Sequence, residues 1–202
     1  MSLCIKNKKV FVAGHNGLAG SAIVRRLKKE DCKVITVEKK KVNLLYRNQI
    51  NKFFQREKPE IVINAAGKVG GIAANINYPL DFIQDNITIQ DNIFRASYDV
   101  KVKRLIFLGS SCIYPYDCKQ PIKEEYLMKG DLERSNEYYA LAKIVGIKTS
   151  EAYNKQLNCD FITVMPTNLY GANDNFNPET SHVPAALVCL LYTSDAADDR
   201  VS

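Results

Sequence analysis

The 202-residue sequence lacks any apolar run near the roughly 20 residues that a membrane-spanning helix requires, which argues against an integral membrane protein. The first ten residues hold too short an apolar stretch for a secretory signal peptide. The six cysteines show neither a pairing pattern nor a CxxC spacing. We therefore expect no membrane partner, a cytoplasmic location with reduced thiols, and no metal site.

The sequence also lacks clustered charge of one sign, internal repeats and low-complexity linkers. Its net charge is +6, but the 28 lysines and arginines are spread along the chain, and the densest group, Lys39–Lys41, is short. We therefore expect no nucleic-acid partner, since a mildly basic surface also suits an enzyme that handles anionic nucleotides. Hydrophobic residues at 46% and charged residues at 25% exclude a disordered or fibrous chain.

Short β-rich runs alternate with longer helical stretches, a pattern typical of a parallel sheet covered by helices. The fold class expected is therefore α/β with a doubly wound parallel sheet. We predict strands over residues 9–13, 33–37, 61–64, 104–108 and 160–165, and helices over residues 17–29, 46–58, 79–98 and 136–156. One domain over residues 1–190 is expected to hold a dinucleotide site and the catalytic centre.

The last residues, 191–202, shift abruptly to small and acidic side chains. They show neither an amphipathic period nor the residues of a turn. A frayed terminal segment would explain this composition. The interpretation that we favour is a tail of non-native sequence.

A glycine-rich segment follows the first predicted strand and opens its helix. It consists of Gly14, His15, Asn16, Gly17, Leu18, Ala19 and Gly20. Glycines at this spacing let a pyrophosphate approach the backbone and the free amides of a helix N-terminus. We predict that these residues bind a dinucleotide; a plain tight turn is the alternative.

The end of the second predicted strand bears on which dinucleotide binds, because a residue that contacts the adenosine ribose is expected there. Glu38 would bind the two ribose hydroxyls of NAD, whereas Lys39 and Lys40 would pair with the 2′-phosphate of NADP. A solvated run of charge is the alternative. We favour NADP and assign all three residues to its site.

Small residues follow the third predicted strand, in the run Asn64-Ala65-Ala66-Gly67. At the carboxyl end of a strand they would let a cofactor lie against the backbone, in the crevice where open α/β sheets bind ligands. An ordinary turn would have the same composition. Ala65 and Ala66 are thus candidate cofactor-binding residues.

Tyr139 and Lys143 lie four residues apart in a predicted helix and so share one face of it. A lysine ammonium beside a phenol is expected to lower the pKa of the tyrosine toward a value useful for acid–base catalysis. Ser110, which follows the fourth predicted strand, would hydrogen-bond a substrate carbonyl beside Tyr139. Together the three residues predict hydride transfer to or from a nicotinamide; a core tyrosine with a snorkelling lysine is the alternative.

Cys112 and His182 form a second candidate pair. A thiolate can remove a proton next to a ketone, and a histidine can return a proton from the other face. A lone buried cysteine is usually inert packing, so the residues by themselves leave this role open.

Several segments carry a resemblance to a known family. They are Ala13–His15, Lys68–Asn75, Leu108–Pro115, Met165–Gly171, Asp174–Phe176 and Ser181–Val183. On these residues the chain resembles the extended, sugar-nucleotide branch of the short-chain dehydrogenase/reductases, within the NAD-dependent epimerase/dehydratase family, and in particular the GDP-L-fucose synthase family. The resemblance implies a Rossmann-like fold whose C-terminal substrate domain is largely absent from this chain.

The resemblance also implies an activity. GDP-4-keto-6-deoxy-D-mannose would be inverted at C3 and C5 and then reduced at C4 by NADPH to give GDP-L-fucose. Cys112 would be the base of epimerisation and His182 its acid. Tyr139 would donate the proton in reduction, Lys143 would lower its pKa and bind the ribose, and Ser110 would hold the carbonyl. The fragment alone is expected to be weakly active or inactive.

Further cofactor-binding residues are implied in the same way. They are Leu108, Gly109, Lys143, Pro166, Thr167, Asn168, Leu169 and His182. Members of this family are homodimers, which implies an interface on the two long helices near Asn86 and Tyr139.

The chain departs from the family pattern at several points. Asn16 stands where the family has a basic residue, so one contact to the 2′-phosphate is weakened, and Lys39 would compensate. Pro184 comes one residue early, which would place the loop of His182 differently. The arginine expected shortly after His182, for the nucleotide diphosphate, is missing from this sequence.

Two alternative functions stay open. One is another extended reductase or epimerase of nucleotide sugars; Cys112 and His182 argue against a simple 4-epimerase, which does not need that pair. The other is a non-catalytic dinucleotide-binding protein, for which Ser110, Tyr139 and Lys143 would be unnecessary.

Overall fold

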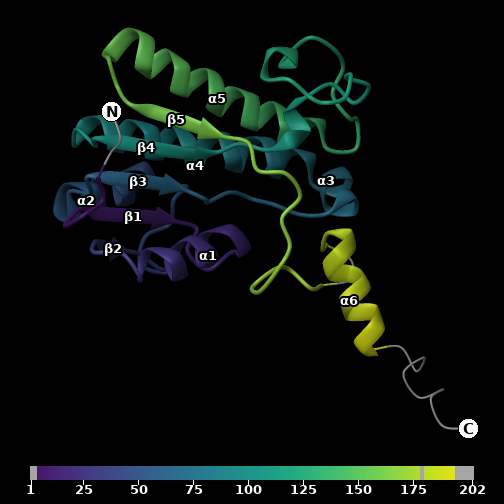
Figure 1. Ribbon diagram of the computed structural model, residues 1–202, viewed down its shortest axis with the longest axis horizontal. Helices are drawn as coiled ribbons and strands as arrows, with labels where there is room; N and C mark the ends of the chain where they lie inside the picture. Colours follow the sequence, from purple (N-terminus) through teal and green to yellow (C-terminus); the bar gives the residue numbers. More distant parts are fainter. Residues whose placement is uncertain (1–3, 178–179, 194–202) are drawn as a thin grey trace, which may run out of the picture.

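Residues 4–177 and 180–193 are described in a computed structural model of the chain, shown in Figure 1. Five parallel strands form one sheet in the order β2-β1-β3-β4-β5. The strands are β1 (Lys9–Ala13), β2 (Lys33–Ile35), β3 (Ile61–Asn64), β4 (Arg104–Leu108) and β5 (Phe161–Val164). The strand order reverses between β1 and β3, and ligands of open α/β sheets bind at the carboxyl ends of the strands at such a point.

In the described ranges, six helices accompany the strands. They are α1 (Leu18–Leu27), α2 (Arg47–Glu57), α3 (Ile72–Asn77), α4 (Pro79–Asp99), α5 (Glu137–Leu157) and α6 (Val183–Thr193), with short 3-10 turns η1 (Ser111–Ile113) and η2 (Glu124–Tyr126). The predicted α/β class and the four predicted helices are confirmed, with helix ends within two residues. Helices α3 and α6 were not predicted.

Two predicted strands are too long. The strand predicted over 33–37 ends at Ile35, because β2 is an edge strand that pairs only with Lys9–Phe11 of β1. On its other side, β1 pairs with β3 through Val10–Ala13. The strand predicted over 160–165 likewise covers only Phe161–Val164, the residues in register with β4.

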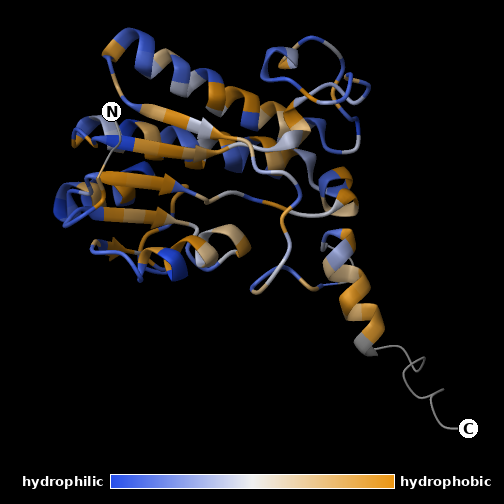
Figure 2. Ribbon diagram, in the orientation of Figure 1, coloured by the Kyte–Doolittle hydropathy of each residue, from blue (hydrophilic) through white to orange (hydrophobic). Residues whose placement is uncertain are grey.

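One face of the sheet carries the main core. Side chains of β1, β3, β4 and β5 pack there against α2, α4 and α5, and Phe94 of α4 lies within 6 Å of the rings of Phe107 and Phe161. In Figure 2 the strands appear as hydrophobic bands inside helices that alternate hydrophobic and hydrophilic residues. This face orients the two long helices that flank the site.

The other face of the sheet is covered unevenly. Helix α1 covers Val10 and Val12 of β1 through Leu27. At the β5 side, Ile162 and Val164 are exposed. Helix α6 extends away from the sheet in Figure 1 and is largely apolar along its length in Figure 2.

Close packing of α5 fixes the position of its catalytic candidates. A Cβ on Gly146 would lie 2.5 Å from Phe107 of β4 and 2.7 Å from the Gln90 side chain of α4. Gln90 donates a hydrogen bond from Nε2 to the Ala142 oxygen at 2.8 Å. Bare backbone at Gly146 thus lets α5 lie against β4 and α4, and places Tyr139 and Lys143 one to two turns along it, near the carboxyl end of β4.

Within the described ranges, no helix is long and apolar enough to cross a membrane. The structure shows free thiols at Cys4, Cys32, Cys112, Cys118 and Cys159. Of the predicted non-native tail, residues 194–202 lie outside the described residues, and its first three residues continue α6. The proposed boundary at residue 190 stays a prediction.

Candidate active site

The glycine-rich segment forms the turn between β1 and α1. Gly14 has a φ of +76°, and a Cβ on it would lie 2.7 Å from the Ala65 oxygen and the Ala66 nitrogen. Gly20 packs as closely, since its Cβ would lie 2.1 Å from the Gly14 oxygen. The turn itself therefore requires glycine at these two positions.

Gly17 is free of such contacts. The nearest atom to a Cβ placed on it is the Gly14 oxygen, at 3.6 Å. Gly17 is also the N-cap of α1, and its helix start receives no side-chain capping bond. A pyrophosphate needs N–H donors and close approach, so an exposed bare backbone at an uncapped helix N-terminus fits it. The residues present are suited to the predicted dinucleotide.

Glu38, just beyond β2, faces the same turn. Its Oε1 lies 3.4 Å from His15 Nε2, and its Oε2 accepts a hydrogen bond from Asn16 Nδ2 at 3.1 Å. Lys39 and Lys40 are exposed. The structure thus brings His15, Asn16 and Glu38 together and leaves the two lysines facing solvent.

The carboxyl ends of β3 and β4 line the crevice next to this turn. The Ala65 amide donates to the Ala13 oxygen at 3.1 Å, so the predicted Ala65–Ala66 pair lies beside Gly14. The Gly109 amide continues the β4 ladder by donating to the Val164 oxygen at 2.8 Å. The small residues predicted at these strand ends are therefore next to the glycine-rich turn or one strand away from it.

Lys143 is buried at the carboxyl end of β4, next to the site. It is 6% exposed, and its Nζ donates to the Leu108 oxygen at 2.8 Å. The same Nζ lies 4.9 Å from the ring centre of Phe107 and 5.6 Å from that of Tyr139. Burial lowers the pKa of Lys143 to about 8. Near neutral pH the lysine is a buried cation held by a carbonyl and two aromatic faces.

The direction predicted for the Tyr139 pKa is wrong. Burial raises the pKa of Tyr139 to about 12, negative charge on Cys112 raises it further, and a hydrogen bond with Ser110 lowers it. The Lys143 ammonium is directed at the Leu108 oxygen and lies over the phenol ring, which explains why it does not offset burial. A phenol with this pKa stays protonated at neutral pH, the form that a proton donor needs.

Cys112 lies on η1, directly after β4 and beside the phenol. Its amide donates to Ser110 Oγ at 3.3 Å, and its Sγ accepts a hydrogen bond from Asn136 Nδ2 at 3.4 Å. Asn136 is the N-cap of α5, yet its side chain makes no capping bond, and its Oδ1 is buried without a partner. The Asn136 amide therefore serves the sulfur rather than the helix.

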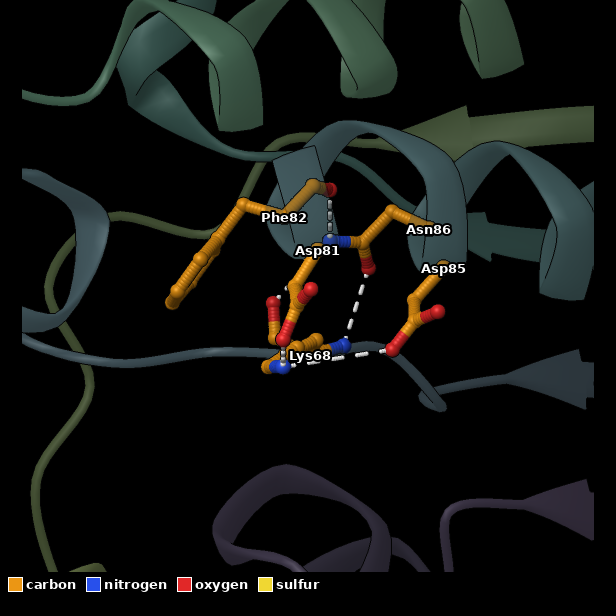
Figure 3. Close-up of polar contacts among 5 residues, drawn as sticks. All are labelled: Lys68, Asp81, Phe82, Asp85 and Asn86. Carbon is orange, nitrogen blue, oxygen red and sulfur yellow. Dashed lines mark hydrogen bonds and ion pairs between the residues drawn. The ribbon is translucent and has the colours of Figure 1, made fainter. Parts of the chain in front are cut away.

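The segment Gly67–Gly71 runs from this centre toward the far end of the crevice. Asn86 of α4 fixes its first part, as Figure 3 shows, by accepting from the Lys68 amide and donating to the Lys68 oxygen, each at 3.0 Å. The Lys68 ammonium pairs with Asp81 and lies 4.0 Å from Asp85. A Cβ on Gly67 would lie 2.7 Å from the Asn86 oxygen and 3.8 Å from Lys143 Nζ. The segment thus begins next to the buried lysine.

The same segment ends against the loop that carries His182. The Gly71 amide donates to the Thr180 oxygen at 2.8 Å, and a Cβ on Gly71 would lie 2.3 Å from the Ser181 oxygen. Asn75 of α3 holds Gly71 from below by donating to its oxygen at 3.0 Å. The His182 side chain is exposed. In the part of the chain that the structure describes, it forms no hydrogen bond with Cys112.

The residues after β5 cross the carboxyl ends of the strands toward α1 (Figure 1). Pro166 is half-buried, whereas Thr167, Asn168 and Leu169 are exposed. Further along, Asn173 Nδ2 donates to Ser21 Oγ of α1 at 3.1 Å. This crossing places the predicted nicotinamide-contacting residues at the strand ends.

Sequence reasoning missed three residues that shape the site, namely Gly71, Asn86 and Asn136. Asn136 precedes Tyr139 by one helical turn, so helical spacing from the tyrosine is the signal that would have found it. Gly71 lies within the Lys68–Asn75 segment that carries the family resemblance. Its role in the site, like that of Asn86, was missed because it comes from contacts with chain segments distant in sequence.

The arrangement combines two kinds of proton transfer at one place. Tyr139 holds a proton, Cys112 offers a sulfur base, and Ser110 contacts both. The described residues hold no cluster of three or more histidine, cysteine or acidic side chains able to bind a metal ion. A ketone bound between these groups would have acid, base and hydrogen-bond donor within reach.

Comparison with known proteins shows the family. Residues 10–197 match the NAD dependent epimerase/dehydratase family. A GDP-L-fucose synthase of Sinorhizobium fredii is 50% identical over 194 residues, which cover 96% of this chain and 62% of the relative. The chain thus spans less than two thirds of that relative's length.

Similar solved structures agree with this family assignment. A GDP-L-fucose synthetase of Naegleria fowleri bound to NADP is 34% identical with a TM-score of 0.85, covering 98% of this chain and 65% of the other. A GDP-mannoheptose C4 reductase of Campylobacter jejuni with NADP bound is 39% identical with a TM-score of 0.85. The match covers 93% of this chain and 55% of the reductase.

Proposed function

This chain belongs to the NAD dependent epimerase/dehydratase family, and we propose that it forms the cofactor-binding and catalytic part of an NADPH-dependent GDP-L-fucose synthase. The reaction converts GDP-4-keto-6-deoxy-D-mannose to GDP-L-fucose by 3,5-epimerisation and 4-keto reduction. The GDP-sugar substrate and NADPH are proposed from the similarity to the fucose synthases and to the NADP-bound structures. Further residues beyond this chain are proposed to bind most of the GDP moiety.

One observation carries the proposal. Cys112 lies close enough to Tyr139 for its charge to raise the pKa of the phenol, and Ser110 contacts both residues. A reductase needs only Ser110, Tyr139 and Lys143. A sulfur base beside the proton donor adds the removal of protons next to the same ketone, which is the chemistry that an epimerase and reductase shares.

Bound NADPH supplies the hydride for C4. The residues of this chain do the rest of the reduction: Ser110 donates a hydrogen bond to the C4 oxygen, and Tyr139 gives it a proton as negative charge develops there. Lys143, a buried cation near neutral pH, is proposed to bind the ribose of the cofactor. The Gly17 backbone holds the pyrophosphate.

Epimerisation uses the same carbonyl, since the C4 ketone makes the C3 and C5 protons acidic. Cys112 as thiolate removes the proton and becomes a thiol, while the electron pair moves to the C4 oxygen, which Ser110 and Tyr139 hold. His182 as imidazolium returns a proton to the opposite face of the same carbon. The Asn136 amide donates a hydrogen bond to the sulfur and so holds it in place.

The remaining assignments are proposals of the same kind. Leu108, Gly109 and Pro166–Leu169 are proposed to contact the nicotinamide half of the cofactor. The complete protein is proposed to be a cytoplasmic homodimer that buries the exposed face of α4 and α5, where Tyr98, Tyr138 and Leu141 are each more than 40% exposed.

Paired variants in the complete enzyme test the function. Tyr139→Phe is expected to lower reduction at least about 100-fold, because the general acid is lost, while C3 and C5 protons still exchange with deuterated solvent. Cys112→Ser is expected to stop that exchange. Tyr46→Phe, at an exposed tyrosine without a proposed role, and Cys118→Ser are the matched controls. Unchanged exchange in Cys112→Ser would remove Cys112 from the mechanism as the epimerisation base.

A second candidate is a GDP-sugar C4 reductase that does not epimerise. The similarity to the mannoheptose C4 reductase favours it. The deuterium exchange experiment separates the two candidates, because a pure reductase would return product without deuterium at C3 or C5.

A further inference from the structure

The adenosine end of the proposed cofactor site contains a carboxylate held in place by the glycine-rich turn. Both side chains between Gly14 and Gly17 contact Glu38: His15 Nε2 lies 3.4 Å from Oε1, and Asn16 Nδ2 donates to Oε2 at 3.1 Å. The His15 side chain is 15% exposed and that of Glu38 is 49% exposed. The two contacts from the turn therefore orient the carboxylate, and its exposed part stays open to a ligand.

A carboxylate at the end of the second strand of such a sheet accepts hydrogen bonds from the adenosine ribose hydroxyls, and it repels a 2′-phosphate at the same position. We infer that Glu38 sets the cofactor selectivity of this chain and makes it accept NADH as well as NADPH. The inference rests on the dinucleotide site of the proposed function. It differs from the use of NADPH alone, which the similarity to the NADP-bound structures suggests.

NADPH is not excluded by this arrangement, because basic residues follow Glu38 in the chain and line the cavity beside the turn. Lys39 and Lys40 follow it in the chain and are exposed. A cavity of about 380 Å³ beside the turn is lined by His15 and Asn16 and also by Arg25 and Lys28 of α1. These cations attract a 2′-phosphate that Glu38 repels, so affinities for NADH and NADPH within about tenfold of each other are expected.

The test measures binding and needs no turnover. The dissociation constants of NADH and NADPH for the 202-residue chain are determined by isothermal titration calorimetry at one pH and low ionic strength. Glu38→Gln keeps the shape of the side chain and removes its charge. It is expected to raise the ratio Kd(NADH)/Kd(NADPH) about tenfold, through tighter NADPH and weaker NADH.

Glu151→Gln is the matched control. It removes the same charge from α5, where Glu151 pairs with Lys148 away from the glycine-rich turn, and is expected to leave the ratio unchanged. A rise of threefold or more in Glu38→Gln with no rise in the control supports the inference. A smaller rise, a fall, or an equal rise in the control overturns it. Binding of neither dinucleotide by the wild-type chain would overturn the cofactor assignment of the proposed function as well.

Discussion

Lys143→Met is expected to stabilise the folded chain while removing a catalytic residue. Lys143 is 6% exposed, and burial lowers its pKa from 10.5 to about 8. That difference corresponds to roughly 3 kcal/mol of unfavourable free energy for folding with the lysine charged. Methionine fills a similar volume without charge, although it leaves the Leu108 oxygen without its donor, at a cost of about 1 kcal/mol.

The sign of the stability difference between Lys143→Met and the wild type depends on pH. Below pH 8 the lysine is protonated in both the folded and the unfolded chain, so the full cost of the buried charge is present. Between pH 8 and 10.5 the unfolded chain binds more protons than the folded one, so wild-type stability rises with pH relative to the variant. Lys143→Met is therefore expected to be about 2 kcal/mol more stable at pH 7 and slightly less stable near pH 10.5.

Urea denaturation followed by circular dichroism at the two pH values measures these differences. Lys155→Met, on the exposed part of the same helix, is the control and is expected to show no change in the pH dependence. Equal destabilisation by Lys143→Met at both pH values would refute the reasoning, because it would mean that burial of the Lys143 charge does not lower the free energy of unfolding at pH 7.

Two further predictions concern the His182 loop and the opposite end of the sheet. Gly71→Ala would place a Cβ 2.3 Å from the Ser181 oxygen and push that loop away, so deuterium incorporation by the complete enzyme is expected to fall while NADPH affinity, measured by calorimetry, stays the same. Hydrogen bonds from Lys103 and other basic groups lower the pKa of Glu60 to about 2. Its stabilisation is present above pH 4.5 and is lost toward pH 2, so Glu60→Gln is expected to destabilise by less than about 1 kcal/mol at pH 7 and not at pH 2 in urea denaturation.

Much of the fold could be predicted because its signals are local. The strands β1, β3 and β4 match their predicted residues, since each is a short apolar run that the sheet buries. Pro79 marked the start of α4 for a similarly local reason. Helix α3 was missed because its six residues are too few to show an apolar stripe, and four of them stay exposed.

The electrostatics of the site could not be predicted in the same way. Helical spacing placed Tyr139 and Lys143 on one face correctly. The direction of the ammonium, however, depends on the Leu108 oxygen, which is distant in sequence. Burial then decided the pKa of the phenol, and burial is a property of the assembled layers rather than of a spacing.

The β5 strand has a consequence for anyone who handles this chain alone. Among the described strands it pairs with β4 only, and Ile162 and Val164 project from it into solvent. A free strand edge with apolar side chains is a template to which the edge of another molecule can add. Samples of the isolated chain should therefore be kept dilute, since the same edge that can accept a neighbouring strand also invites aggregation.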